Sequence, residues 1–310
     1  MTQSTDSILM IRPASFRMNE ETAVNNYFQQ KDDHVATANE LAQKEFDAFV
    51  AELRKNGIQV IVVEDDKKLD TPDALFPNNW VSFHENAVVG LYPMFAENRR
   101  RERREEVIEQ IEKKGFQVNN FIDYTDAEND DVFLEGTGSL VLDRINKKAY
   151  CAISDRASED LLMEFCEDFE YFPIMFHANQ THQKKRLPIY HTNVMMCIGT
   201  EVAIIASSTI DDQKERKMVL ENLKNDGKII IEINEDQMHH FAGNMLEVRN
   251  NSNDKIMVMS DQAKSALSDL QLDQLQKHTT IVSANLSIIE KYGGGSARCM
   301  MAEIFLPKAD

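Results

Sequence analysis

The sequence predicts an α/β protein made of five similar units, and three observations support this prediction. Apolar runs of strand length occur along the whole chain of 310 residues. Amphipathic helical patterns separate these runs. Five times, a turn that bears glycine or asparagine leads into an apolar run, at intervals of about 55 residues. Alternating strands and helices are typical of the α/β class, and five near-equal units suit a closed ring.

The expected strands are short apolar runs bounded by polar or glycine-bearing turns. They cover residues 8–13, 59–65, 86–93, 139–143, 148–154, 193–199, 201–207, 228–234, 245–248, 255–260 and 279–284. In at least four of the five units, a second strand closely follows the first. We therefore expect each unit to contain a pair of neighbouring strands.

Three segments between these runs predict amphipathic helices, at 38–57, 157–169 and 212–227. In the first of them the apolar residues recur every three or four positions, and Gly57 ends the pattern. The stretch "ENRRRERREE" (97–106) alternates acidic and basic residues at helical spacing. We expect it to form a solvated helix face.

Composition excludes several classes of partner and location. The chain has 34 basic and 52 acidic residues, a net charge of −18, which disfavours nucleic acid and anionic membranes as partners. The start lacks a leader pattern, and no stretch approaches the length of a membrane span. The four cysteines have no CxxC spacing. We expect one domain over residues 1–310 in a reducing cytoplasm, and the sequence leaves a homo-oligomer open.

Polar residues gather at the five turns that precede the first strands, and these turns would face the axis of a closed ring. They are Asn78 and Asn79, Glu135, His191 and Asn193, Asn244, and Arg298 and Cys299. A thiol, an imidazole and a carboxylate from three units are the groups that Cys-dependent nucleophilic catalysis needs. The turns therefore predict an active site on the axis.

Cys299 is the candidate nucleophile because its neighbourhood differs from that of the other cysteines. Cys151 and Cys197 lie in apolar strands, and Cys166 lies on an amphipathic helix, where free cysteine is a small core residue. Cys299 follows Arg298 and a run of three glycines. Glycine lets backbone approach a substrate closely, and an adjacent cation can lower a thiol pKa.

Plainer interpretations of the same residues stay open. Cys299 would then be a core thiol, Glu135 a loop acid and His191 a structural histidine. The spacing of the other histidines gives only a weak signal for a metal site, because no helical pair with an acid occurs. "GTGSL" (136–140) lacks the lysine of a phosphate loop.

Four motifs together resemble the guanidine-modifying enzyme superfamily. In order they are "FPNNW" (76–80), "FLEGTGSLVLD" (133–143), "YHTNV" (190–194) and "GGGSARCM" (293–300). They are most similar to the citrulline-utilisation hydrolases and amidinotransferase-like proteins related to arginine deiminase. The first seventy residues add only general support. The resemblance implies the pentein fold, an α/β-propeller of five ββαβ units around a pseudo-fivefold axis. It also implies a site without metal or organic cofactor.

The resemblance also implies a role for each site residue. Cys299 would attack the central carbon of a guanidinium or ureido group. His191 would protonate the departing amine and then activate water. Glu135 would lie on the far side of His191 or contact substrate nitrogens. For the substrate α-carboxylate, "AISDRAS" (152–158) offers Arg156, and Arg186 is a weaker candidate; either could instead be a surface arginine.

The sequence departs from the arginine deiminase pattern at two positions, where Asn79 and Asn193 replace aspartates. Two carboxylates can balance a buried guanidinium, whereas two amides cannot. An amide offers donors and an acceptor that complement a neutral ureido group. We therefore expect hydrolysis of citrulline to ornithine, ammonia and carbon dioxide, with Asn78 and Arg298 completing the substrate contacts.

Three alternatives to this function remain. They are an arginine deiminase-type enzyme, an amidinotransferase, and a non-catalytic pentein that binds amino acids. The polar stretch 177–190 is long enough to form a lid loop over the site, although its lysines could equally be solvated surface.

Overall fold

The computed structural model describes residues 2–30 and 37–309. Its strands are β1 (Ser7–Arg12), β2 (Gln59–Glu64), β3 (Val81–Phe83), β4 (Val88–Leu91), β5 (Asn120–Asp123), β6 (Leu140–Asp143), β7 (Lys148–Ala152), β8 (Phe172–Phe176), β9 (Asn179–His182), β10 (Lys185–Pro188), β11 (Met196–Ile198), β12 (Val202–Ile205), β13 (Ile229–Glu232), β14 (Leu246–Arg249), β15 (Lys255–Ser260), β16 (Thr280–Ala284) and β17 (Ala302–Glu303).

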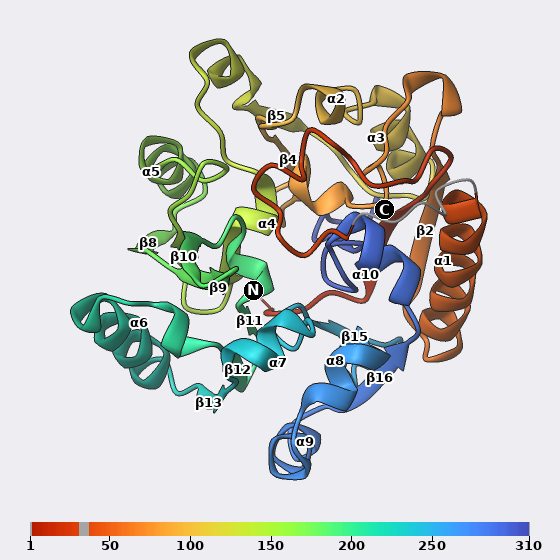
Figure 1. Cartoon of the computed structure of the whole chain (residues 1–310). Coiled ribbons are helices and arrows are strands. Elements are labelled where there is room, and N and C mark those ends of the chain that lie inside the picture. The colour runs from red at the N-terminus through yellow and green to blue at the C-terminus, as the bar shows by residue number, and fades with distance from the viewer. Residues whose placement is uncertain (1, 31–36, 310) are drawn as a thin grey trace.

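These strands form five three-stranded sheets and one two-stranded hairpin within the described residues. The sheets have the orders β17–β1–β2, β3–β4–β5, β6–β7–β8, β11–β12–β13 and β14–β15–β16. In each, the middle strand is antiparallel to the first strand of the order and parallel to the third. Figure 1 shows the sheets following one another around the centre in chain order, with helices such as α1, α5, α6 and α9 at the periphery.

The C-terminal strand completes the first sheet. In β17, Glu303 lies opposite Ile8 of β1, and the register is antiparallel. The strands that open the five sheets begin at residues 81, 140, 196, 246 and 302, which reproduces the period found in the sequence. The α/β class is therefore confirmed, and a closed propeller of five units stays a prediction.

The helices are α1 (Ala38–Lys55), α2 (Glu97–Arg100), α3 (Glu105–Glu112), α4 (Gly136–Ser139), α5 (Glu159–Asp168), α6 (Gln213–Asn225), α7 (Glu235–His239), α8 (Asp261–Ala266), α9 (Asp269–Gln276) and α10 (Ser287–Gly293). The helices expected at 38–57, 157–169 and 212–227 are confirmed as α1, α5 and α6. Within the described residues, no helix has the length and apolar character needed to cross a membrane.

Two expectations about surface segments are wrong. Residues 97–106 do not form one solvated helix face, because α2 ends at Arg100 and the side chains of Arg99 and Glu102 are buried, with 2% and 3% of their surface exposed. These two opposite charges satisfy each other in the interior. Residues 177–190 are not an irregular loop either, since β9 and β10 pair as an antiparallel hairpin; that this segment forms a lid over the site stays a prediction.

Close backbone packing brings the site turns together. The single-turn helix α4 packs against two short 3₁₀ helices, η3 (Pro77–Asn79) and η5 (Thr192–Val194). Gly138 of α4 leaves no room for a side chain, because an added Cβ would lie 2.3 Å from Asn79 Nδ2 and 2.9 Å from His191 Nδ1. The glycine-bearing motif therefore allows three units to meet at one point.

Candidate active site

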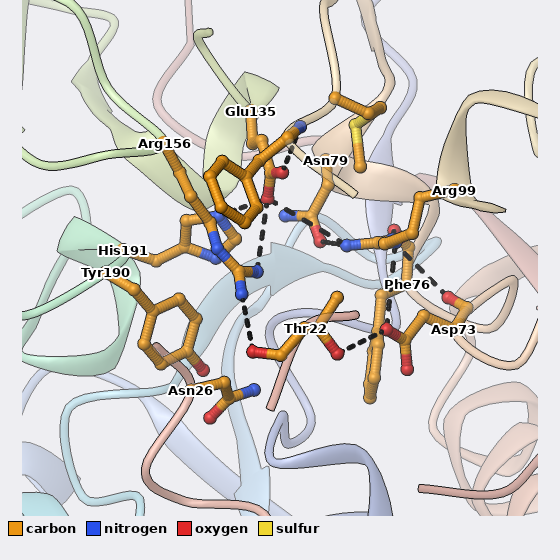
Figure 2. A network of polar contacts seen from close by, with 12 residues as sticks. Thr22, Asn26, Asp73, Phe76, Asn79, Arg99, Glu135, Arg156, Tyr190 and His191 are labelled. Atoms are coloured by element: carbon orange, nitrogen blue, oxygen red, sulfur yellow. Dashed lines mark hydrogen bonds and ion pairs between the residues drawn. The ribbon is translucent and has the colours of Figure 1, made fainter. Parts of the chain in front are cut away.

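A small cavity of ≈20 Å³ lies where these turns meet. Its lining comes from segments far apart in the sequence: Thr22, Asn26, Asp73, Phe76, Asn79, Arg99, Arg156, Tyr190, His191, Gly293, Gly294, Gly295 and Cys299. Figure 2 shows most of these side chains and the polar contacts that connect them. A cavity of this volume holds about one water molecule. Entry of an amino acid therefore requires the surrounding segments to move.

His191 and Glu135 form a buried pair at the edge of this cavity (Figure 2). His191 Nε2 lies 2.7 Å from Glu135 Oε2. The other carboxylate oxygen of Glu135 accepts a hydrogen bond from the Phe95 N–H at 3.0 Å. Arg156 Nη1 is 3.5 Å from Glu135 Oε2, and Arg99 Nη1 is 4.0 Å from it. The imidazole is thus held by a carboxylate that is itself held from three further directions.

The charges around this pair keep the carboxylate ionised and the imidazole neutral. Burial acts to raise the pKa of Glu135, but Arg156, His191 and Arg99 together lower it to about 2. Burial lowers the pKa of His191 to about 4, although Glu135 acts in the opposite direction. Because an ionised carboxylate can only accept, Nε2 donates to it and Nδ1 carries the free lone pair. His191 is therefore arranged as a base at Nδ1.

Cys299 lines the same cavity, in the loop that follows α10. Its Sγ lies 3.3 Å from Asn244 Nδ2 and 3.5 Å from Asn193 Nδ2. With its amide oriented to satisfy both partners, Asn78 donates to the Cys299 carbonyl oxygen at 2.7 Å and accepts from the Gly138 N–H at 3.3 Å. Amide N–H groups directed at sulfur can stabilise negative charge that develops on it during attack.

The four cysteines are all unpaired and buried, but their environments differ. Burial raises the pKa of Cys151, Cys166 and Cys197 to about 12, as expected for inert core thiols. Only the Cys299 thiol faces the cavity that His191 lines. In the described part of the chain, no hydrogen bond joins Cys299 to His191, although both line this cavity.

Arg99 fixes the orientation of the Asn79 amide. Arg99 Nη1 donates to Asn79 Oδ1 at 2.8 Å, and its Nε and Nη2 each donate to Glu102 at 2.9 Å. Because a guanidinium has no acceptor, Asn79 must present its oxygen to Arg99. Its Nδ2 group then faces Gly138 and His191. Sequence reasoning missed Arg99 and Glu102, because their charge pattern is also that of a solvated helix.

Asp73 was also missed. Its Oδ2 accepts hydrogen bonds from Asn19 at 2.8 Å and from Thr22 at 3.1 Å, while its buried Oδ1 has no partner within the described residues. Burial raises the pKa of Asp73, and the charge of Arg99 opposes this shift. The only signal in the sequence is that Asp73 lies just before the "FPNNW" motif.

The three candidate arginines have different surroundings. Arg156 is buried in the cavity wall, where Nη2 donates to the Thr22 carbonyl at 2.9 Å and Nε donates to Asn25 Oδ1 at 3.0 Å. Its guanidinium also lies 4.9 Å from the centre of the Tyr190 ring. Arg156 therefore ties the N-terminal segment around residue 22 to Glu135 and the site.

The structure does not bring Arg186 or Arg298 into the cavity. Arg186 is on the β9–β10 hairpin, where it forms ion pairs with Asp211 at 2.6 Å and Glu235 at 2.9 Å. The Arg298 side chain bonds the Met301 carbonyl at 3.0 Å and Glu303 at 3.2 Å. Both guanidinium groups are engaged by partners outside the cavity, and neither residue lines it; their contact with a substrate stays a prediction.

No group of three or more His, Cys, Asp or Glu side chains within residues 2–30 and 37–309 is arranged to hold a metal ion.

Comparison with protein families gives a match over nearly the whole chain. The model of the family described as N,N dimethylarginine dimethylhydrolase, eukaryotic, matches residues 12–306. A search of curated proteins finds no relative that matches.

Several solved structures share the fold at low sequence identity. ArgZ, an arginine dihydrolase from the ornithine–ammonia cycle in cyanobacteria, is 17% identical with a TM-score of 0.73; the match covers 97% of this chain and 41% of that chain. The N-terminal domain of ArgZ bound to product is 18% identical with a TM-score of 0.72, covering 97% and 99%. A dimethylarginine dimethylaminohydrolase adduct with S-methyl-L-thiocitrulline is 14% identical with a TM-score of 0.63, covering 98% and 100%. The chain thus spans less than half the length of the ArgZ chain in the first of these structures.

Proposed function

The chain belongs to the eukaryotic N,N-dimethylarginine dimethylhydrolase family, among the guanidino-modifying pentein enzymes with an α/β fold, and from this premise we propose that it is a Cys-dependent hydrolase of citrulline. The products would be ornithine, ammonia and carbon dioxide. The proposal includes a single pentein domain of five units over residues 1–310, with Cys299, His191 and Glu135 as the catalytic groups.

The orientation of the Asn79 amide is the observation that carries this substrate. Arg99 holds Asn79 Oδ1, so the group left to meet a substrate is the Nδ2 donor. A ureido group has a carbonyl oxygen that can accept from this donor, whereas a guanidinium offers only donors. The two groups that donate to Cys299 Sγ are Asn193 Nδ2 and Asn244 Nδ2, and both also belong to neutral amides. These neutral donors favour a neutral reacting group.

The reaction would begin with proton transfer from the Cys299 thiol to His191 Nδ1 as sulfur attacks the ureido carbon. His191 then returns this proton to the departing ammonia, which leaves a thiocarbamate between Cys299 and the substrate nitrogen. Water attacks this carbon while His191 accepts its proton, and the thiol is restored. The released carbamate of ornithine loses carbon dioxide. Glu135 stabilises the imidazolium formed in both steps.

The α-ammonium group of the substrate would be bound by Asp73. Its Oδ1 is buried in the cavity wall without a partner in the described residues, and a cation is the group that best satisfies it. Arg156 and the residues beside it would then face the α-carboxylate of the substrate, provided that the segment around Thr22 moves when the substrate enters.

One observation favours arginine as a second candidate substrate. The buried charged groups in and beside the cavity are three carboxylates, Asp73, Glu102 and Glu135, and two arginines, Arg99 and Arg156. Burial raises the pKa of Glu102 to about 7 and also raises the pKa of Asp73, so the surplus carboxyl group adds at most one negative charge, which favours a substrate with a net positive charge. A hydrolase acting on the guanidino group of arginine would use the same Cys299 and His191.

Product analysis by mass spectrometry would separate these functions. Citrulline and arginine are supplied separately to the full-length protein, with Cys299→Ala as control. Citrulline should give ornithine and ammonia, and the control should give neither. Citrulline formed from arginine would contradict the proposal that the substrate is a ureido compound. Unchanged turnover in the control would contradict the assignment of Cys299 as the nucleophile. If neither citrulline nor arginine gives a product, the result would favour a non-catalytic protein that binds amino acids.

A further inference from the structure

A second, larger cavity of ≈460 Å³ lies at the other ends of two strands that lead away from the site. Asn79 precedes β3 and Glu135 precedes β6, whereas His84 and Arg144 follow these strands. The lining residues are His84, Glu85, Asn86, Arg144, Lys147, Asp168, Phe169, Glu170, Tyr171 and Phe305. None of them lines the cavity that contains Cys299. This volume is within the range of small-molecule sites.

Arg144 gives the base of this cavity a buried positive charge, and although burial acts to lower the pKa of Arg144, Glu303 and Tyr171 raise it. Only 4% of its surface is exposed, and its guanidinium lies 3.9 Å from the centre of the Phe305 ring. Its ion-pair partner in the described residues is Glu303, at 3.7 Å, which is beyond hydrogen-bond range. The same Glu303 oxygen binds Arg298 at 3.2 Å. Two buried arginines therefore share one carboxylate, so a further anion would be stabilised at Arg144.

The remaining inner wall is aromatic, with a second cation beside it. The His84 ring stacks on Phe169 with 3.9 Å between centroids. Lys147 Nζ lies 4.8 Å from the centre of the Tyr171 ring and donates to the Phe169 carbonyl at 3.1 Å. Burial and the charges of Arg144 and Lys147 lower the pKa of His84, so this ring is neutral at pH 7. Flat apolar surfaces thus flank the positive base.

The rim of the cavity has the opposite sign. Glu85, Asp168 and Glu170 line it, and all three are exposed. One carboxylate oxygen of Asp168 accepts a hydrogen bond from the Tyr124 hydroxyl at 2.8 Å. A positive base with an acidic rim complements a molecule that has a carboxylate at its inner end and an ammonium group at its outer end.

We propose that this cavity binds a free amino acid with an aromatic or other apolar side chain. Its carboxylate pairs with Arg144, its ammonium group lies at the acidic rim, and its side chain packs between Phe169, Tyr171 and Phe305. The site is separate from the one proposed for hydrolysis, and no covalent step occurs there.

Calorimetric titration of the full-length protein tests this site with three probes. L-phenylalanine and 3-phenylpropionate contain the carboxylate, and phenethylamine lacks it. The two carboxylates should bind, and the amine should bind at least tenfold more weakly. Arg144→Gln should weaken the binding of both carboxylate probes at least tenfold. Arg104→Gln removes an arginine outside this cavity and should leave their binding unchanged. Equal binding of acid and amine, or no binding of L-phenylalanine, would overturn the proposal.

Because Arg144 is buried, a second variant on the exposed rim keeps the test independent of folding. Glu85→Gln combined with Glu170→Gln should weaken the binding of L-phenylalanine at least threefold. The binding of 3-phenylpropionate should stay unchanged or become tighter, since of these two probes only L-phenylalanine has an ammonium group. A loss of equal size for both probes would contradict the proposed orientation. The result is also independent of the hydrolase proposal, because Cys299→Ala should bind all three probes as the unmodified protein does.

Discussion

At the scale of single residues, the chemistry of the site depends on which atom each buried group can present. Asn79 has both a donor and an acceptor, and Arg99 selects the donor for the cavity by binding the oxygen. His191 has two ring nitrogens, and Glu135 selects Nδ1 as the free base by accepting from Nε2. In both cases a buried charged neighbour removes a choice that the side chain has in water.

Asn79→Asp should reduce citrulline hydrolysis. A carboxylate in place of the amide would face the substrate oxygen with a second acceptor instead of a donor. Loss of one such donor lowers kcat by about 10² to 10³ in comparable sites. We expect kcat/KM for citrulline to fall by about this factor in a steady-state ammonia assay. Exposed Asn86→Asp is the control and should retain activity. Undiminished citrulline turnover in Asn79→Asp would show that the amide donor has no role.

The pH dependence of kcat/KM should reflect the low pKa of His191. The free base is the active form, and a pKa of about 4 keeps it mostly neutral above about pH 5. Between pH 5 and 7, protonation of His191 should therefore cause no loss of kcat/KM for citrulline. An acid limb with a midpoint near 6.5, the ordinary value for histidine, would contradict this assignment. Glu135→Gln should lower kcat, because the imidazolium would lose its counter-charge.

At the scale of elements, the site depends on short turns that pack without side chains between them. Helix α4 has only one turn, yet it contacts η3 from one unit and η5 from another. Gly136 of α4 has φ +41°, and an added Cβ there would lie 2.5 Å from the Asn78 carbonyl. The motif around Glu135 thus places a carboxylate and also makes room for the neighbouring motifs.

Gly138→Ala should impair catalysis more than folding. The new methyl group would displace Asn79 and His191, which lie 2.3 and 2.9 Å from its position. Misplacement of catalytic groups by about 1 Å can cost about 10²-fold, so we expect a fall of that order in kcat/KM. Gly115→Ala is the matched control: its φ of +87° should cost about 1 kcal/mol of stability, but no atom lies within 4 Å. Equal kinetics in the two variants would exclude the steric argument.

At the scale of the whole molecule, the ends of the chain meet in one sheet. The Ile304 N–H donates to the Ser7 carbonyl at 2.9 Å, and the Thr5 hydroxyl donates to the Ile304 carbonyl at 2.6 Å. Cys299 lies three residues before β17, so the pairing of β17 with β1 also holds the position of the thiol. The first seventy residues, which added little to the prediction of function, are therefore part of the support of the site.

Ile304→Ala should destabilise the fold and reduce activity together. Ile304 is 1% exposed, and truncation of a buried isoleucine to alanine costs about 2 to 5 kcal/mol. The urea midpoint of unfolding should fall accordingly. Ile145→Ala removes the same atoms from a residue that is 45% exposed and should change stability by less than about 0.5 kcal/mol. Equal midpoints for the two variants would contradict the role of the C-terminal strand.

The sequence by itself determined the class, most strands and the longer helices, because apolar periodicity follows directly from which face of an element is buried. The repeated turns also indicated that Glu135, His191 and Cys299 come from different units, and the structure places His191 and Cys299 in one cavity with Glu135 bound to His191 at its edge. Only the tertiary structure decided which charged residues lie inside. Arg99 and Glu102 are buried as a pair that Asn79 joins, and buried Asp73 accepts from Asn19 and Thr22. Arg186 and Arg298 bind partners outside the cavity. A local pattern of charges is the same for a solvated helix and for a buried ion pair, since the difference is made by atoms that are distant in the sequence.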